Sequence, residues 1–188
     1  YFTLTFLRVL YSLLILFFLF VNPAYSARDT DSYDGNIYPI YAGNGSLVPP
    51  SSTLSESLKN ERTSVLVFYL DDSAVSKQYA PVVSGIKLLW SSSVDLIPLS
   101  IDELDNDDQK TFKDPGYYWH GKIPQTVIID GKGNVLLDEE GQVSFEDIND
   151  AITRGTGLKK PDFDLTVKSF NEYNSEPSKD GYTRPRGS

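Results

Sequence analysis

Apolar and polar positions alternate along the chain in blocks that predict an α/β fold. Residues 64–70 form a continuous run of apolar, β-branched and aromatic side chains, which is typical of a buried central strand. Between residues 73 and 90 the apolar side chains recur at helical spacing, and residues 94–100 repeat the strand pattern. Because a helical crossover joins parallel strands, these two strands are predicted to be parallel neighbours in one sheet.

The pattern that follows predicts a closing hairpin and a last helix. Residues 126–130 and 135–138 flank Gly131-Lys132-Gly133-Asn134, which is typical of a turn between two antiparallel strands. Ser144 is placed to cap a helix that ends at Gly155 or Gly157. The sheet is therefore predicted to be mixed and to be flanked by helices.

Upstream of the first strand the pattern is weaker. Ser51 or Ser52 is predicted to cap a short helix that runs to Asn60. Residues 28–50 are polar and rich in Gly and Pro, and we expect an extended polar segment in which residues 38–41 form a short edge strand. The globular domain is thus expected to span residues 51–157.

Both ends of the chain differ in character from this domain. Residues 9–21 form an apolar run behind Arg8 and end before small residues at 24–26, so residues 1–27 are predicted to be a cleaved signal peptide or a retained membrane anchor. Either alternative takes the rest of the chain out of the cytoplasm. Residues 158–188 are predicted to be a disordered tail, in which residues 163–176 form a docking motif or simply part of a featureless tail.

Composition excludes several classes of function. The 188 residues carry 17 Lys and Arg against 26 Asp and Glu, a net charge of −9, which argues against nucleic-acid binding. The chain has no Cys and one His, so zinc has no adequate ligand set and no cofactor is expected. A hydrolase built from Ser73 or Ser76 with His120 would lack a nucleophile elbow. The acidic stretch 101–112 is interpreted as a solvated surface.

The order of elements, with Ser73 and Ser76 at a helix start and Ile123-Pro124 before a strand, resembles the thioredoxin fold over residues 51–157. That resemblance implies that Ser73 and Ser76 stand where thioredoxins carry Cys-x-x-Cys, that Pro124 is the cis-proline facing them, and that Val67 replaces a buried proton-relaying acid. Thiol–disulfide exchange needs a thiolate, which no residue of this chain supplies. We therefore expect no enzymatic activity.

The resemblance to thioredoxins also implies a groove that binds a client polypeptide. Carried over to this chain, and together with Ser73 and Ser76, its residues are Asp72, Tyr117, Tyr118, Trp119, Ile123 and Pro124. The three aromatic side chains resemble an interface anchor, since such residues contribute strongly to binding. The alternative is that they cap the edge of the core.

A narrower resemblance covers almost everything after the N-terminal run. It rests on Asp34-Gly35-Asn36-Ile37, Phe68-Tyr69-Leu70-Asp71-Asp72, Pro124-Gln125-Thr126-Val127, Gly116-Tyr117-Tyr118 and the stretches 41–50 and 168–176. In these the chain is similar to the cyanobacterial thylakoid membrane photosystem I accumulation factors. The resemblance implies a non-catalytic, membrane-associated helper that photosystem I needs in order to accumulate, with photosystem I subunits or other assembly factors as partners. Arg8 before the apolar run predicts that residues 28–188 lie on the lumenal side of the thylakoid membrane. The alternative is a degenerate thiol–disulfide oxidoreductase or a regulatory partner of one.

Overall fold

A mixed four-stranded sheet organises the domain. The computed structural model describes residue 6, residue 11 and residues 26–90, 92–104 and 110–160. The strand order is β2-β1-β3-β4, and the bounds are β1 (Ser64–Tyr69), β2 (Asp95–Ser100), β3 (Gln125–Ile129) and β4 (Val135–Glu140). Strands β1 and β2 are parallel, whereas β3 is antiparallel to both β1 and β4. The predicted parallel pair and closing hairpin are confirmed.

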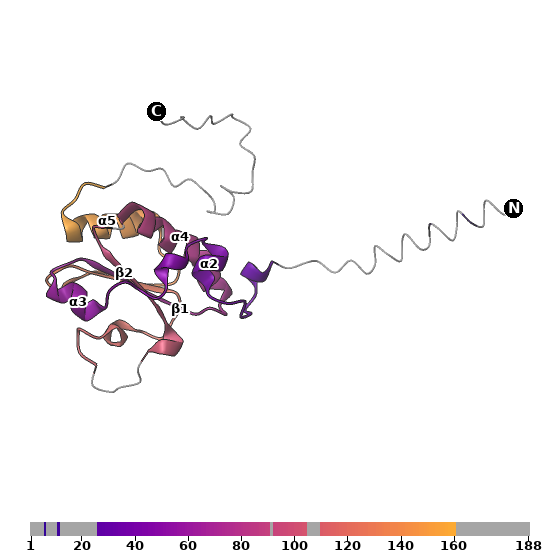
Figure 1. The fold of residues 1–188 in the computed structure, drawn as a ribbon, viewed down its shortest axis with the longest axis horizontal. Helices are drawn as coiled ribbons and strands as arrows, with labels where there is room; N and C mark the ends of the chain where they lie inside the picture. The colour runs from indigo at the N-terminus through magenta and orange to yellow at the C-terminus, as the bar shows by residue number, and fades with distance from the viewer. Residues whose placement is uncertain (1–5, 7–10, 12–25, 91, 105–109, 161–188) are drawn as a thin grey trace, which may run out of the picture.

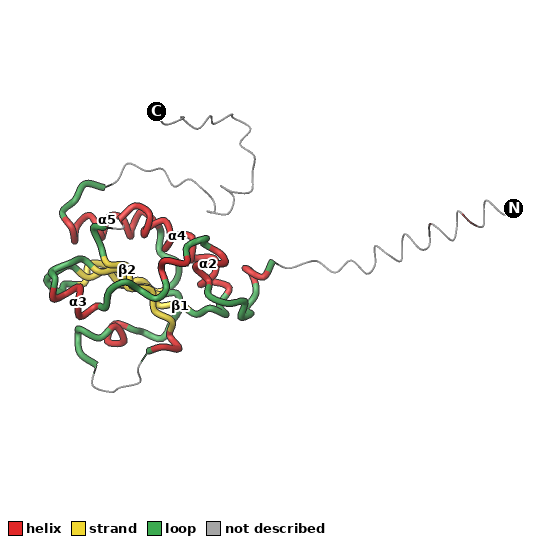
Figure 2. Tube along the Cα trace, in the orientation of Figure 1, coloured by secondary structure: helices red, strands yellow, loops and turns green. Residues whose placement is uncertain are grey.

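Helices cover both faces of the sheet (Figures 1 and 2). Helix α4 (Ala74–Trp90) forms the crossover from β1 to β2 and lies with α2 (Ile37–Tyr41) and α5 (Phe145–Thr156) over one face, while α3 (Leu54–Lys59) lies on the other. Four short 3-10 turns complete the elements: η1 (Ala27–Asp29), η2 (Gly45–Leu47), η3 (Ile101–Glu103) and η4 (Pro115–Tyr118). This strand order, with a cis-proline just before β3, is the thioredoxin fold.

Strand β1 is buried on both sides because its side chains alternate between two cores. Val65, Val67 and Tyr69 pack in the larger cluster with residues of α2, α4 and α5. Leu66 and Phe68 face the smaller cluster, which includes Leu54 of α3 and Tyr118 of η4. Successive side chains of a strand point to opposite faces of the sheet, so the apolar residues of β1 contribute to both hydrophobic cores.

The helix ends follow from specific side chains. Thr53, rather than Ser51 or Ser52, caps α3 in a capping box with Glu56, so the predicted cap was displaced by one or two residues. Ser144 caps α5 as predicted, and Gly157 ends that helix with a left-handed φ of 69°. A left-handed backbone is easily adopted by glycine, which explains why the helix stops there.

The predictions of an extended polar segment at residues 28–50 and of an edge strand at 38–41 are wrong. Ile37–Tyr41 is helix α2, which Asn36 begins by accepting a hydrogen bond from the Tyr38 N–H. Ile37 and Tyr38 are each 1% exposed and Leu47 is 2% exposed, so this region is part of the main core. The apolar side chains among the glycines and prolines pack against α4 instead of pairing with the sheet edge.

Within the described residues no helix has both the length and the apolar character needed to cross a membrane. The apolar run 9–21, apart from Tyr11, and the tail motif 163–176 lie outside that part of the chain. Of the acidic stretch, residues 101–104 and 110–112 are described, and Ile101–Glu103 forms a 3-10 turn.

Candidate functional site

Ser73 lies in the turn that leads from β1 into α4, and Ser76 lies in the first turn of that helix. The Ser76 side chain is buried at 1% exposure, and its Oγ accepts a hydrogen bond from the Leu70 N–H at 3.2 Å. The Ser73 Oγ in turn accepts from the Ser76 N–H at 3.4 Å. Both hydroxyls therefore shape this turn, and among the described residues neither is bonded to His120, as a serine hydrolase would require.

The interior behind these serines holds no acid. Val67 is 2% exposed and lies opposite Pro98 and Thr126 in the neighbouring strands. The Tyr79 hydroxyl lies 2.8 Å from the Thr126 Oγ1, and burial raises the pKa of Tyr79 to about 12. Because the chain has no cysteine, a Cys-x-x-Cys redox site is absent.

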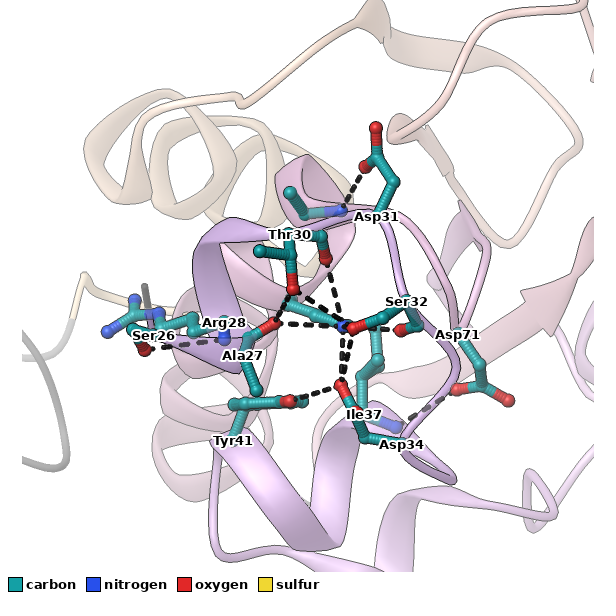
Figure 3. Close-up of polar contacts among 12 residues, drawn as sticks. Ser26, Ala27, Arg28, Thr30, Asp31, Ser32, Asp34, Ile37, Tyr41 and Asp71 are labelled. Carbon is teal, nitrogen blue, oxygen red and sulfur yellow. Dashed lines mark hydrogen bonds and ion pairs between the residues drawn. The ribbon is translucent and has the colours of Figure 1, made fainter. Parts of the chain in front are cut away.

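A carboxylate from the N-terminal part of the domain sits at the start of α4. The Asp31 Oδ1 accepts a hydrogen bond from the Ala74 N–H at 2.8 Å (Figure 3). A negative charge at a helix N-terminus is favourable, because the unpaired N–H groups there carry partial positive charge. In redox enzymes the same kind of helix end stabilises a thiolate. In this protein the Asp31 carboxylate of the same chain occupies that favourable position.

Lys77 lies in the second turn of α4 and is completely buried. Its Nζ donates to the main-chain oxygens of Ala27 (3.0 Å), Thr30 (3.1 Å) and Ser32, and to the Ser32 hydroxyl. It also forms an ion pair with the Asp34 Oδ2 at 2.6 Å (Figure 3). Lys77 therefore holds residues 26–34, here called the N-terminal segment, against α4, together with the Asp31–Ala74 contact and the hydrogen bonds that Gln78 forms with Arg28 and Asp29.

The charges in this cluster stabilise one another. Burial lowers the pKa of Lys77, but the hydrogen bond with Asp34 and the neighbouring Tyr41 outweigh it, and the pKa is raised overall. The hydrogen bonds from Lys77 and Tyr41 lower the pKa of Asp34, and the Tyr41 hydroxyl donates to the Asp34 Oδ2 at 2.7 Å. Lys77 and Asp34 are therefore both charged at neutral pH.

The loop before β3 and the loop after β1 lie together at one end of the two central strands. Phe68 lies opposite Gln125 in the β1–β3 ladder, so both loops leave the sheet side by side. The Ile123–Pro124 peptide bond is cis, as the resemblance to thioredoxins implied. The Pro124 oxygen accepts from the Gly141 N–H at 2.6 Å, which ties this loop to the end of β4.

The three neighbouring aromatic side chains have different environments. Tyr118 is buried and its hydroxyl donates to the Phe112 oxygen at 2.9 Å, while the half-buried Trp119 packs on Phe68 with ring centroids 5.3 Å apart. Tyr117 is 56% exposed. Tyr118 and Trp119 thus contribute to the core edge, and Tyr117 is the ring presented to solvent.

A polar cluster fixes the loop between Tyr118 and Pro124. The buried Gln125 side chain donates to the Tyr118 oxygen (2.7 Å) and to the Asp138 Oδ1 (2.8 Å), and it accepts from the His120 N–H (3.0 Å). The His120 Nε2 lies 2.8 Å from the Asp138 Oδ2. His120 is therefore a positioning residue of this loop, and the described residues contain no group of three or more potential metal-ligating His, Cys, Asp or Glu side chains.

In the part of the chain that the structure describes, the main chain of Ile123 carries unpaired polar groups at the end of the sheet where these two loops meet. Within the described residues, no hydrogen bond is found for the main-chain N–H or C=O of Ile123. Val75, in the first turn of α4, is 44% exposed, and Asp72 is exposed in the turn before it. We refer to Asp72, Val75, Tyr117, Ile123 and Pro124 as the groove.

Sequence reasoning missed Asp31, Asp34, Lys77 and Val75 as parts of this region. A lysine in a helical pattern is ordinarily expected to face solvent, so the burial of Lys77 was not predicted. The residues around Asp31 and Asp34 show no pattern that predicts a helix or a strand. The available signal was the position of Lys77 on the apolar side of α4, beside the buried Ser76 and Ala80.

A relative among well-described proteins identifies the family of this chain. It is 42% identical over 157 residues to "Thylakoid membrane protein slr1796" of Synechocystis sp., covering 81% of this chain and 77% of that protein. The chain belongs to the family of this protein. No model of a protein family matches the sequence.

Among solved structures, the exposed lipoprotein thioredoxin Etrx1 of Streptococcus pneumoniae is similar to part of the chain. The sequence identity is 13% and the TM-score is 0.41, over 52% of this chain and 89% of that chain. The thioredoxin fold is assigned here from the strand order and from the cis-proline before β3.

Proposed function

We propose that this protein is a non-enzymatic thioredoxin-like factor that binds an extended segment of a client polypeptide in the groove. The observation that carries the proposal is the unpaired main chain of Ile123 beside the cis-Pro124. Main-chain N–H and C=O groups need hydrogen-bond partners once water is excluded, and an extended chain that lies alongside the loop before β3 can supply them to Ile123.

Exposed apolar side chains of the two neighbouring elements would give such a client further contact. Val75 projects from the start of α4 and Tyr117 from η4, and both are more than two-fifths exposed. Exposed aromatic and aliphatic residues around free main-chain groups favour a peptide over a small polar molecule. The groove needs no thiol to bind in this way.

At a finer level, we propose that the protein acts at the thylakoid membrane, on its lumenal side, and supports the accumulation of photosystem I. The family relationship to a protein named for the thylakoid membrane supports the location. The proposed clients are photosystem I subunits or other assembly factors. A degenerate oxidoreductase is disfavoured because the chain lacks any cysteine, although a regulatory partner of such an enzyme would use the same groove.

Site-specific photo-crosslinking in cells tests the proposal. A benzophenone side chain introduced in place of Tyr117 should crosslink to a photosystem I subunit or assembly factor that mass spectrometry identifies. The same side chain in place of Leu88, which is 59% exposed near the other end of α4, is the control. Adding Val75→Glu should remove the crosslink from position 117, whereas Leu88→Glu should leave it unchanged.

Two results would contradict the proposal. Equal crosslinking from positions 117 and 88 would show that the groove is not the contact surface. Normal accumulation of photosystem I in cells that carry Val75→Glu would show that binding at the groove is not what the cell requires. We prefer Tyr117 to Trp119 as the probe position, because truncating Trp119 would also disturb its packing on Phe68.

A further inference from the structure

A cavity of about 320 Å³ lies at the end of the sheet opposite to the groove. The groove precedes β3, whereas this cavity is bounded by the turn that follows β3, by α3 and by the segment before η4. Its lining residues are Ser55, Leu58, Lys59, Phe112, Lys113, Gly131, Lys132 and Gly133. The volume falls at the lower end of the range typical of small-ligand sites, roughly 300–1,000 Å³.

The lining carries three positive charges and no acidic side chain. This is unusual in a chain whose acidic residues exceed its basic ones by nine. Within the part of the chain that the structure describes, Lys59, Lys113 and Lys132 form no ion pair, while Lys77, Lys122 and Lys160 each contact a carboxylate. The three lysines of the cavity are therefore available to a ligand.

Glu56, Asp114 and Asp130 are each adjacent in sequence to a lining residue, and each is engaged by its own turn. The Glu56 carboxylate accepts from the Thr53 N–H and hydroxyl, and the Asp114 carboxylate accepts from the Thr111 N–H and hydroxyl. The Asp130 carboxylate accepts from the Lys132 and Asn134 N–H groups (2.8 and 2.9 Å) and from the Asn134 Nδ2 (2.9 Å). Burial raises the pKa of Asp130, but these hydrogen bonds outweigh it and the pKa is lowered overall. Asp130 thus stays ionised and holds the turn, and it does not line the cavity.

The cavity has a defined shape. Gly131 lies so close to the turn after α3 that a Cβ atom there would come within 2.1 Å of the Glu61 oxygen, which only glycine avoids. This close approach fixes the β3–β4 turn against the connection that leads into β1. Leu58 and Phe112 form an apolar wall, and the Lys113 Nζ lies 5.8 Å from the centroid of the Phe112 ring.

From these features we infer that the cavity binds a phosphate- or sulfate-type oxyanion that is attached to an apolar group. Lysine binds phosphate-type anions as a compact point charge, and three lysines without a lining acid can match the two or more negative charges of such a group. The apolar wall accounts for the attached group, which can be a lipid or a soluble metabolite.

Calorimetric titration of the full chain in micelles of dodecyl maltoside, a detergent without phosphate or sulfate, tests this inference. One arm uses inorganic phosphate, and the other uses dihexanoyl phosphatidylglycerol below its micellar concentration. The pocket variant is Lys59→Gln/Lys113→Gln/Lys132→Gln. The control is Lys87→Gln/Lys122→Gln/Lys159→Gln, which changes the net charge equally at positions outside the cavity.

We expect at least one probe to bind with one-to-one stoichiometry, an affinity loss of tenfold or more in the pocket variant, and less than a twofold change in the control. Stronger binding of phosphatidylglycerol than of phosphate would identify a lipid headgroup as the ligand. Stronger binding of phosphate would identify a soluble one. Absence of binding by both probes, or equal losses in the two triple variants, would overturn the inference. Circular dichroism of both variants verifies that each is folded.

Discussion

Lys77 illustrates how a single residue can join the N-terminal segment to the domain. Substituting it by Met keeps the volume but removes the only donor to the Asp34 carboxylate other than Ser32 and Tyr41, and it leaves three main-chain oxygens without their Nζ partner. Lys77 is buried, and its loss leaves these main-chain oxygens without a donor, whereas the Asp34 side chain is 31% exposed and can turn to water. We therefore expect Lys77→Met to lower the free energy of unfolding by about 1–3 kcal/mol. Urea denaturation measures this change.

The matched control for Lys77→Met is Lys87→Met on the same helix. Lys87 is partly exposed and has no recorded ion pair, so its loss should change stability by less than about 0.5 kcal/mol. If both variants unfolded at the same urea concentration, the buried cluster would not be what holds residues 26–34 in place.

Asp34 should make the ion pair with Lys77, and with it the stability of the domain, sensitive to acid. Its folded-state pKa lies below the ordinary value of 3.8, so the unfolded chain binds more protons near that pH and stability falls as the pH is lowered. The contribution of Asp34 is fully present above its unfolded pKa and disappears as the pH falls through the lower folded value. Asp34→Asn should therefore flatten the decline of stability below about pH 4. Urea midpoints of both proteins between pH 6 and pH 3 measure it, and parallel curves would contradict the assignment.

At the level of elements, the start of α4 should be a poor site for a thiolate. In Ser73→Cys/Ser76→Cys the introduced thiols would lie near the Asp31 carboxylate, which already occupies the favourable position at the helix end. A nearby negative charge raises the pKa of a thiol, so we expect weak insulin-disulfide reduction. Adding Asp31→Asn should lower the thiol pKa, as measured by the pH dependence of thiol alkylation, and should raise the reduction rate.

The wild-type chain, with no thiol, supplies the blank for that assay. The double variant also tests Val67, since no acid is present to relay protons. If the double variant reached the rate of an ordinary thioredoxin without Asp31→Asn, neither the carboxylate at the helix start nor the apolar residue at position 67 would be limiting.

Elements with strong periodicity were predictable from the sequence, and those made by tertiary contacts were not. The strands at residues 64–70 and 94–100, the helix between them and the hairpin each show a local pattern that the fold preserves. Helix α2 is five residues long and contains a proline, so no local pattern identifies it, and its burial against α4 decides its structure. The buried Lys77 and the three-lysine cavity depend on residues distant in sequence, which single-chain patterns do not reveal.

For the whole molecule, the two candidate binding regions lie at opposite ends of one sheet, and they differ in the polar groups that they present. The groove combines apolar side chains with free main-chain groups, and the cavity combines lysines with an apolar wall. Residues 26–34, which follow the apolar N-terminal run, are bound to α4 next to the groove. If that run is retained as an anchor, the groove is therefore the region tied most directly to the membrane, which suits the capture of a client during membrane assembly.

The orientation of the molecule across the membrane gives a last prediction. Arg8 lies before the apolar run, and positive charges favour the cytoplasmic side, so residues 26–160 should lie in the thylakoid lumen. Protease added to sealed thylakoid vesicles with their cytoplasmic face outward should leave the domain intact, and detergent should then permit its digestion. A protein known to be exposed on the cytoplasmic face serves as the digestion control. Loss of the domain before detergent is added would place it on the cytoplasmic side, where the proposed client segment would have to be cytoplasmic as well.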